Sequence, residues 1–231
     1  MPSTWLVALS WISLGLAFAC AGSILVDVYW RGHRQSMWIM EVVWPVTALY
    51  LGPLTWWGYA RYGRPSTGRW LAERDRREPP DRPSWASVAV GVSHCGAGCT
   101  LGDIIAEFTI FGLGITLAGE ALLAEYIGDY LLAVVLGLLF QYFAIAPARG
   151  LRLGAGVAAA AKADVASLTA FEVGLFAWMA VVAHLLFPAP HHVRPDSPVY
   201  WFMMQIGMCL GFLTAYPVNA WLIRRGIKEA M

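Results

Sequence analysis

The residue types most able to do chemistry lie together in one apolar segment, residues 93–107 (SHCGAGCTLGDIIAE). The segment holds an imidazole, two thiols and two carboxylates, from His94, Cys95, Cys99, Asp103 and Glu107. Residues four apart lie close to one face of a helix, so the thiols and carboxylates form one stripe, while His94 lies about 100° from Cys95. Because thiolate and imidazole groups bind Cu(I) and Zn(II), this pattern predicts a metal site near the membrane midplane.

A second segment, residues 203–209 (MMQIGMC), supplies further soft ligands. Met208 and Cys209 are expected at the same membrane depth as the two thiols of the first segment, and Met204 shares a helix face with Met208. Thioether and thiolate ligands together favour Cu(I) as the bound metal. Zn(II), held by the two thiols, the imidazole and Asp103, is the alternative. The expected metal ligands are His94, Cys95, Cys99, Met208, Asp103 and Cys209.

The same residues permit three other interpretations. Gly98 and Gly102 have the spacing of small residues that let two helices pack closely, and Met and Cys commonly fill helix interfaces. The two thiols could instead be the redox pair of a membrane thiol oxidoreductase or of a redox-centre subunit. Helical residues four apart hold their Cβ atoms about 5 to 6 Å apart, whereas a disulfide needs about 3.5 to 4.5 Å, so the helix would have to open. The third interpretation is a structural partner in a larger membrane complex.

Polar residues at other depths suggest a route for ions past this site. Ionisable groups are costly in a bilayer, so each is a functional hypothesis. Glu172 also has a structural explanation, because with Thr169 it forms a capping box that would start a helix. The expected ion path comprises Glu107, Glu41, Met40, Met204 and Glu172. No catalytic residue is predicted, and a transporter or metal-binding protein fits better than an enzyme.

The composition requires these residues to be positioned by membrane helices. Of the 231 residues 58% are hydrophobic and 13% are charged, against about 25% charged in an average soluble domain. The mean hydropathy is +0.57. A formal charge of +1 provides no basic field for nucleic acid. We therefore predict an all-α integral membrane bundle whose partners are the lipid bilayer and a metal ion, with a homo-oligomer or a larger complex open.

Apolar stretches of about 20 residues predict six membrane spans. They are Trp5–Tyr29, Met37–Tyr59, Trp85–Leu113, Tyr130–Ala148, Ala170–Phe187 and Trp201–Leu222. Basic loops stay on the cytoplasmic side, which favours two cytoplasmic termini. In that topology Arg31, Arg34 and Arg194 are the basic residues on the outside.

Four segments carry a resemblance to a known family: SHCGAGCTLGDIIAE, FQYFAIAP, SLTAFEVG and MMQIGMCLGFLTAYPVNAWLIRRGIKEAM. Through them the chain resembles the bacterial membrane family called domain of unknown function 4396 (DUF4396) from about Ser84 to Met231. Residues 1–64, the first two expected helices of a single transmembrane domain, are more generic. The resemblance implies a multi-pass protein of the bacterial plasma (inner) membrane, and it implies no activity, substrate or catalytic residue.

Overall fold

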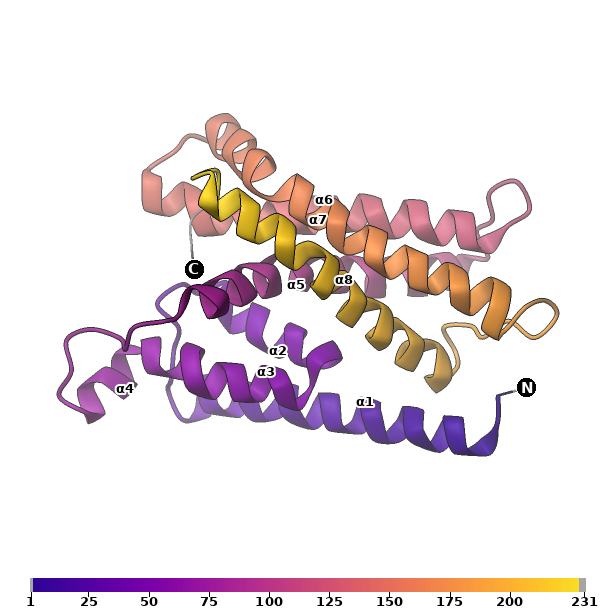
Figure 1. The fold of residues 1–231 in the computed structure, drawn as a ribbon, viewed down its shortest axis with the longest axis horizontal. Coiled ribbons are helices and arrows are strands. Elements are labelled where there is room, and N and C mark those ends of the chain that lie inside the picture. Colours follow the sequence, from indigo (N-terminus) through magenta and orange to yellow (C-terminus); the bar gives the residue numbers. More distant parts are fainter. Residues whose placement is uncertain (1, 229–231) are drawn as a thin grey trace.

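The computed structural model describes residues 2–228, with the side chains of all of these except residues 145–149. The described chain is helical, as predicted, and its one β feature is an isolated bridge between Leu117 and Glu120. Five helices are long and apolar enough to cross a membrane. They are α1 (Thr4–Leu25, extended by the π-helical turn η1, Val26–Trp30), α5 (Ser84–Leu113), α6 (Ala121–Arg149), α7 (Leu153–Val181, extended by η4, Val182–Leu186) and α8 (Pro198–Arg224). They lie along the long axis of the molecule (Figure 1).

The expected span Met37–Tyr59 does not form one continuous helix, because this segment turns back on itself. Helix α2 (Met40–Leu51) ends at Gly52, which has φ of +51°, and α3 (Pro53–Gly58) returns toward the end where α2 began (Figure 1). Glycine adopts this backbone conformation readily, and Pro53 has no N–H with which to continue the helix. After α3 come the short turns η2 (Tyr59–Gly63) and η3 (Arg64–Ser66) and the helix α4 (Gly68–Glu73).

Helix α8 supplies hydrogen bonds to the tip of this hairpin. Pro53 cannot donate to the Leu49 carbonyl, and Gln205 Nε2 donates to that oxygen instead at 2.6 Å. Cys209 Sγ donates to the Tyr50 carbonyl at 3.5 Å. Broken helices are tolerated at membrane depth where side chains satisfy the freed backbone groups.

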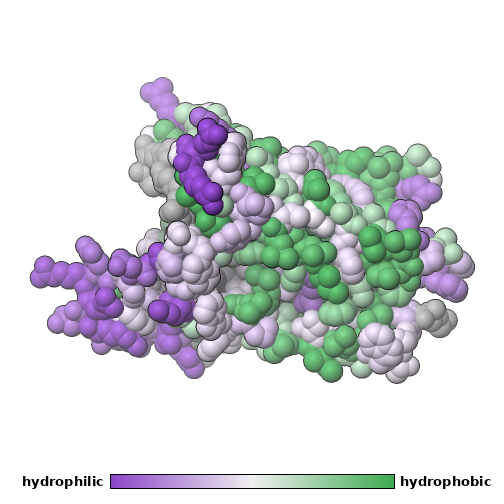
Figure 2. All heavy atoms as spheres, viewed as in Figure 1, coloured by the Kyte–Doolittle hydropathy of each residue, from purple (hydrophilic) through white to green (hydrophobic). Residues whose placement is uncertain are grey.

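The hairpin bears on the expected topology, because five described helices, an odd number, are long and apolar enough to cross a membrane. The start of α1 and the end of α8 lie at opposite ends of the long axis rather than on one side (Figure 1). Of the 16 Lys and Arg residues, all within the described part of the chain, Arg194 lies at one end and Lys162 lies inside α7, while the others lie in or near the segments between helices at the other end. We call the end with Arg194 the opposite end and the other the basic end. Figure 2 shows hydrophilic residues concentrated at the basic end. Because basic loops stay inside, this distribution predicts that the basic end faces the cytoplasm.

Glycines set the distances between the four helices α5 to α8. A methyl group at Gly102 would lie 2.6 Å from the Ala133 nitrogen, and one at Gly98 would lie 2.8 Å from the Gly137 Cα. At Gly174 the corresponding distance to the Gly211 Cα is 2.9 Å. The predicted close packing at Gly98 and Gly102 is therefore confirmed, and the partner of α5 is α6. These contacts bring the polar faces of the helices together inside the bundle.

Candidate functional site

The polar stripe of α5 faces the interior of the bundle. Cys95, Cys99 and Asp103 have no exposed surface, and Glu107 is 2% exposed. Helix α5 is continuous through the glycines of this segment, so successive members of the stripe are about 6 Å apart along the axis. The four side chains thus form a line of about 18 Å from the middle of the membrane toward the opposite end.

Carboxyl groups from two other helices join this line. Asp129 on α6 lies near Glu107 and Asp103, and Glu172 on α7 lies near Asp103 and Cys99. We call Asp103, Glu107, Asp129 and Glu172 the carboxyl row. All four are buried, and both oxygens of Asp103 and of Glu172 and one oxygen each of Glu107 and Asp129 have no hydrogen-bond partner. An unpaired carboxylate is costly in an apolar interior, so each group must hold a proton or a cation.

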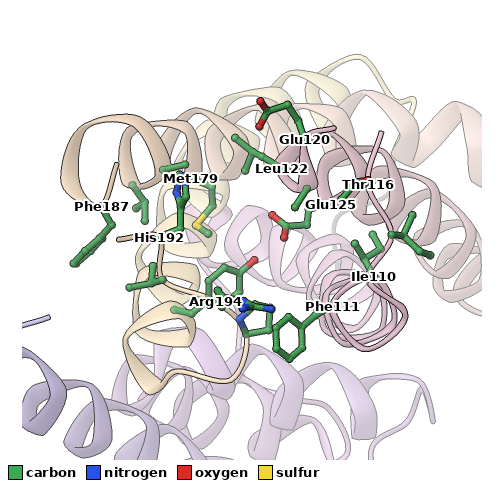
Figure 3. Close-up of a pocket in the computed structure, with 18 of the residues that line it drawn as sticks. Ile110, Phe111, Thr116, Glu120, Leu122, Glu125, Met179, Phe187, His192 and Arg194 are labelled. Atoms are coloured by element: carbon green, nitrogen blue, oxygen red, sulfur yellow. The ribbon is translucent and has the colours of Figure 1, made fainter. Parts of the chain in front are cut away.

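A pocket at the opposite end lies beside the Glu107 end of this row. The pocket has a volume of about 380 Å³, and its wall includes Glu120, Glu125 and His192. Figure 3 shows the pocket and these side chains among those that line it. Tyr200 also lines it, with a buried and unpartnered hydroxyl, and it lies near Glu107. Tyr200 therefore lies between Glu107 and this pocket, which we call the end pocket.

An ion pair lies on the other side of the thiols, toward the basic end. Lys228 Nζ lies 2.8 Å from Asp164 Oδ1, and neither side chain is exposed. His94 lies close to both and packs edge-on against the Phe140 ring, at a centroid distance of 6.2 Å. Both imidazole nitrogens lack a hydrogen-bond partner. The polar interior thus extends from the end pocket through the carboxyl row and the thiols to this pair.

The structure does not gather the six expected metal ligands into one shell. His94 lies against α6, Met208 Sδ accepts from the Thr100 hydroxyl at 3.7 Å, and Cys209 donates to the hairpin. Among residues 2–228, no three His, Cys, Asp or Glu side chains lie where they could hold one metal ion. Cys95 and Cys99 remain a thiol pair, both free, with Asp103 near Cys99.

The residues of the expected ion path divide into two groups. Glu107 and Glu172 belong to the carboxyl row. Glu41 instead pairs with Arg34 at 2.7 Å near the basic end, and Met40 is packed in the core beside it. Met204 lines an apolar groove between α1, α5 and α8.

The capping interpretation of Glu172 is wrong, because α7 begins about five turns earlier. The helix starts at Leu153 and runs without a break past Thr169 and Glu172. The Thr169 hydroxyl donates to the Val165 carbonyl at 2.8 Å, a bond typical of Thr inside a helix. Glu172 is therefore an interior residue of a long helix, with no local role at a helix end.

Three residues of this interior were missed in the sequence. Asp129 fell outside the expected span that starts at Tyr130. Its spacing of four residues from Glu125, which places both carboxyl groups on one helix face, was the signal that could have found it. Tyr200 fell one residue outside the expected span that starts at Trp201. Lys228 was counted among the basic loops, and the glycine at 226 was the one hint that the chain turns back after α8.

Comparison with protein families distinguishes the region from residue 84 onward from the N-terminal part of the chain. A family model described as "Domain of unknown function (DUF4396)" matches residues 84–228. The matched region contains α5 to α8, the whole carboxyl row, the thiol pair and Lys228. No curated protein and no solved structure matches the chain.

Proposed function

This membrane protein belongs to the DUF4396 family, and we propose that it moves a soft metal cation, Cu(I), across the bacterial plasma membrane in exchange for protons. The observation that carries the proposal is the carboxyl row, with its buried and unpartnered oxygens, next to the thiol pair. Ionisable residues inside a membrane typically mark ion pathways and proton relays. The row supplies sites for protons, and the thiols supply a site for the metal.

The thiol pair favours Cu(I) as the metal. Soft thiolate ligands select Cu(I), and two of them are enough to hold this ion in a linear arrangement. Cys95 and Cys99 lie one turn apart on α5 and are fully buried. Binding of one Cu⁺ to two thiols releases two protons, because the metal binds thiolates. Asp103 and Glu172 lie near Cys99, where each carboxyl group can accept a released proton as it passes its own proton to the next group of the row.

Copper movement can be tested in vesicles that contain the purified protein. Cu⁺, kept reduced under anaerobic conditions, is added outside, and a copper-sensitive dye and a pH-sensitive dye report on the interior. We expect copper to enter and protons to leave the vesicles. Replacement of both thiols, Cys95→Ser with Cys99→Ser, should lower the copper flux about tenfold or more. Cys20→Ser removes a thiol outside the site and is the matched control.

Three results would overturn the proposal. The first is equal copper flux in the thiol variant and the control. The second is Zn²⁺ flux in the absence of copper flux, which would make Zn(II) the cargo. The third is a disulfide between the two thiols in aerobic samples together with no flux of either metal, which would favour thiol redox chemistry.

A further inference from the structure

The segment after α8 inserts a lysine into the bundle. Helix α8 ends at Arg224, and Gly226, with φ of +65°, lets the chain turn back so that the Ile227 and Lys228 amides both donate to the Leu222 carbonyl. The Lys228 side chain then points inward and is completely buried. A buried ammonium is costly without a partner, so the surroundings must provide one.

Two oxygen atoms contact the ammonium group, and a third oxygen, from Asn219, lies nearby. Its nitrogen lies 2.8 Å from Asp164 Oδ1 and 3.5 Å from the Gly91 carbonyl oxygen. Asn219 lies against the same glycine: a methyl group at Gly91 would be 3.8 Å from Asn219 Oδ1 and 4.0 Å from Lys228 Cε. The second Asp164 oxygen and Asn219 Oδ1 have no hydrogen-bond partner. A carboxylate, a backbone carbonyl and an amide oxygen together form the ligand set of a hard cation.

The position of the Lys228 ammonium also affects any cation that moves between the thiols and the basic end. Lys228 lies near both Cys95 and Cys99, on the side toward the basic end. Any cation that passes from the thiols to the basic end meets a positive charge held in place by Asp164. Because the ammonium already compensates the charge of Asp164, no negative charge is left there to attract that cation.

We infer that Asp164, Gly91 and Asn219 form a cation site, and that the ammonium of Lys228 occupies this site as a tethered cation that closes the basic end of the path. The closing role rests on the proposed function, whereas the cation site does not. The site takes an alkylammonium or a small hard cation when the lysine side chain is removed.

The cation site is tested by chemical rescue. Lys228→Ala leaves Asp164 buried without a partner, so the melting temperature in detergent should fall. Propylammonium chloride should restore it in a saturable manner, and sodium chloride at equal ionic strength should restore it less. The double variant Asp164→Asn with Lys228→Ala should not respond, and neither should Lys162→Ala, which removes an exposed lysine of α7. A Lys228→Ala protein that melts like the native chain, or that ignores propylammonium, would overturn the site.

The closing role is tested in copper-loaded vesicles with the charge-neutral variant Asp164→Asn with Lys228→Gln, which removes both charges together. We expect copper flux to rise about fivefold or more. Propylammonium should slow the flux of the Lys228→Ala protein and leave the native protein unchanged. Flux equal to or below that of the native protein, in a variant that melts normally, would overturn the closing role. Absence of copper flux in every variant, with rescue by propylammonium intact, would instead overturn the proposed function and leave the cation site standing.

Discussion

At the scale of single residues, the buried carboxyl groups divide into two kinds. Asp164 has a full positive partner in Lys228, whereas both oxygens of Asp103 and of Glu172 have none. Removing one member of a buried ion pair leaves the other charge uncompensated, while neutralising an unpaired group removes a cost. The two kinds of group should therefore respond to substitution in opposite ways.

We predict that Asp164→Asn lowers the free energy of unfolding by about 3 to 5 kcal/mol, because Lys228 is left unpaired. Glu172→Gln should leave it unchanged or raise it, since Gln has nearly the same shape and carries no charge. Thermal melting in detergent distinguishes the two. Equal destabilisation by both variants would show that Glu172 also has a partner in the folded protein.

Much of the α5 stripe could be predicted at this scale, because helical spacing alone places Cys95, Cys99, Asp103 and Glu107 on one face. The surroundings of each residue could not be predicted, because they depend on which helix packs against that face. The side of α5 on which His94 lies was one such case. Its imidazole lies against Phe140 of α6, away from Met208 of α8, and nothing within residues 93–107 determines this.

At the scale of elements, the contact between α5 and α6 depends on two small residues of α5, Gly98 and Gly102. A methyl group added at Gly102 would lie 2.6 Å from the backbone nitrogen of Ala133. A methyl group added at Gly112, on the same helix, would have nothing within 4 Å. We predict that Gly102→Ala costs about 1 to 3 kcal/mol through overpacking. Gly112→Ala should be neutral or slightly stabilising, because Ala favours helix. Chemical denaturation of both variants in detergent is the measurement, and similar stabilities would contradict a close contact at Gly102.

Gln205 of α8 holds the hairpin of α2 and α3 in place. Gln205 donates to the Leu49 carbonyl and accepts from the Ser13 hydroxyl at 2.7 Å, so it joins the hairpin to α1 and α8. Gln205→Leu should cost about 1 to 3 kcal/mol, because a buried carbonyl loses its donor. It should also speed proteolysis within residues 40–63. Leu213→Ala, on the exposed face of α8, is the control, and identical proteolysis of the two variants would contradict this role for Gln205.

The hairpin was the element that sequence reasoning described least well. Average hydropathy over Met37–Tyr59 is that of a span, and averaging conceals the effect of Gly52 followed by Pro53. The interruption is local, and the hydrogen bonds that make it tolerable come from α8, more than 150 positions away in the chain. A sequence window cannot contain both partners. The long helices were easier to predict, because their apolar residues are contiguous.

At the scale of the whole molecule, the hairpin reverses the expected side of the N-terminal end. Five spans place the loop between α5 and α6 at the opposite end and the loop that carries α4 at the basic end. We predict that a single cysteine at Thr116, in a chain otherwise free of cysteine, reacts with a membrane-impermeant thiol reagent added to intact cells. A cysteine at Asp75 should react after the cells are opened. The reverse pattern would contradict the orientation, and reaction at both positions in intact cells would contradict the arrangement of spans.

Exchange of copper for protons depends on the carboxyl row as the path for the protons. The most direct measurement is proton flux in copper-loaded vesicles, for the native protein and for the variant Asp103→Asn with Glu172→Gln. Glu120→Gln, at the exposed rim of the end pocket, is the matched control. We predict that the control exchanges copper for protons like the native protein and that the double variant, although it folds and keeps both thiols, loses the proton flux. Undiminished proton flux in the double variant would contradict a proton path along the carboxyl row.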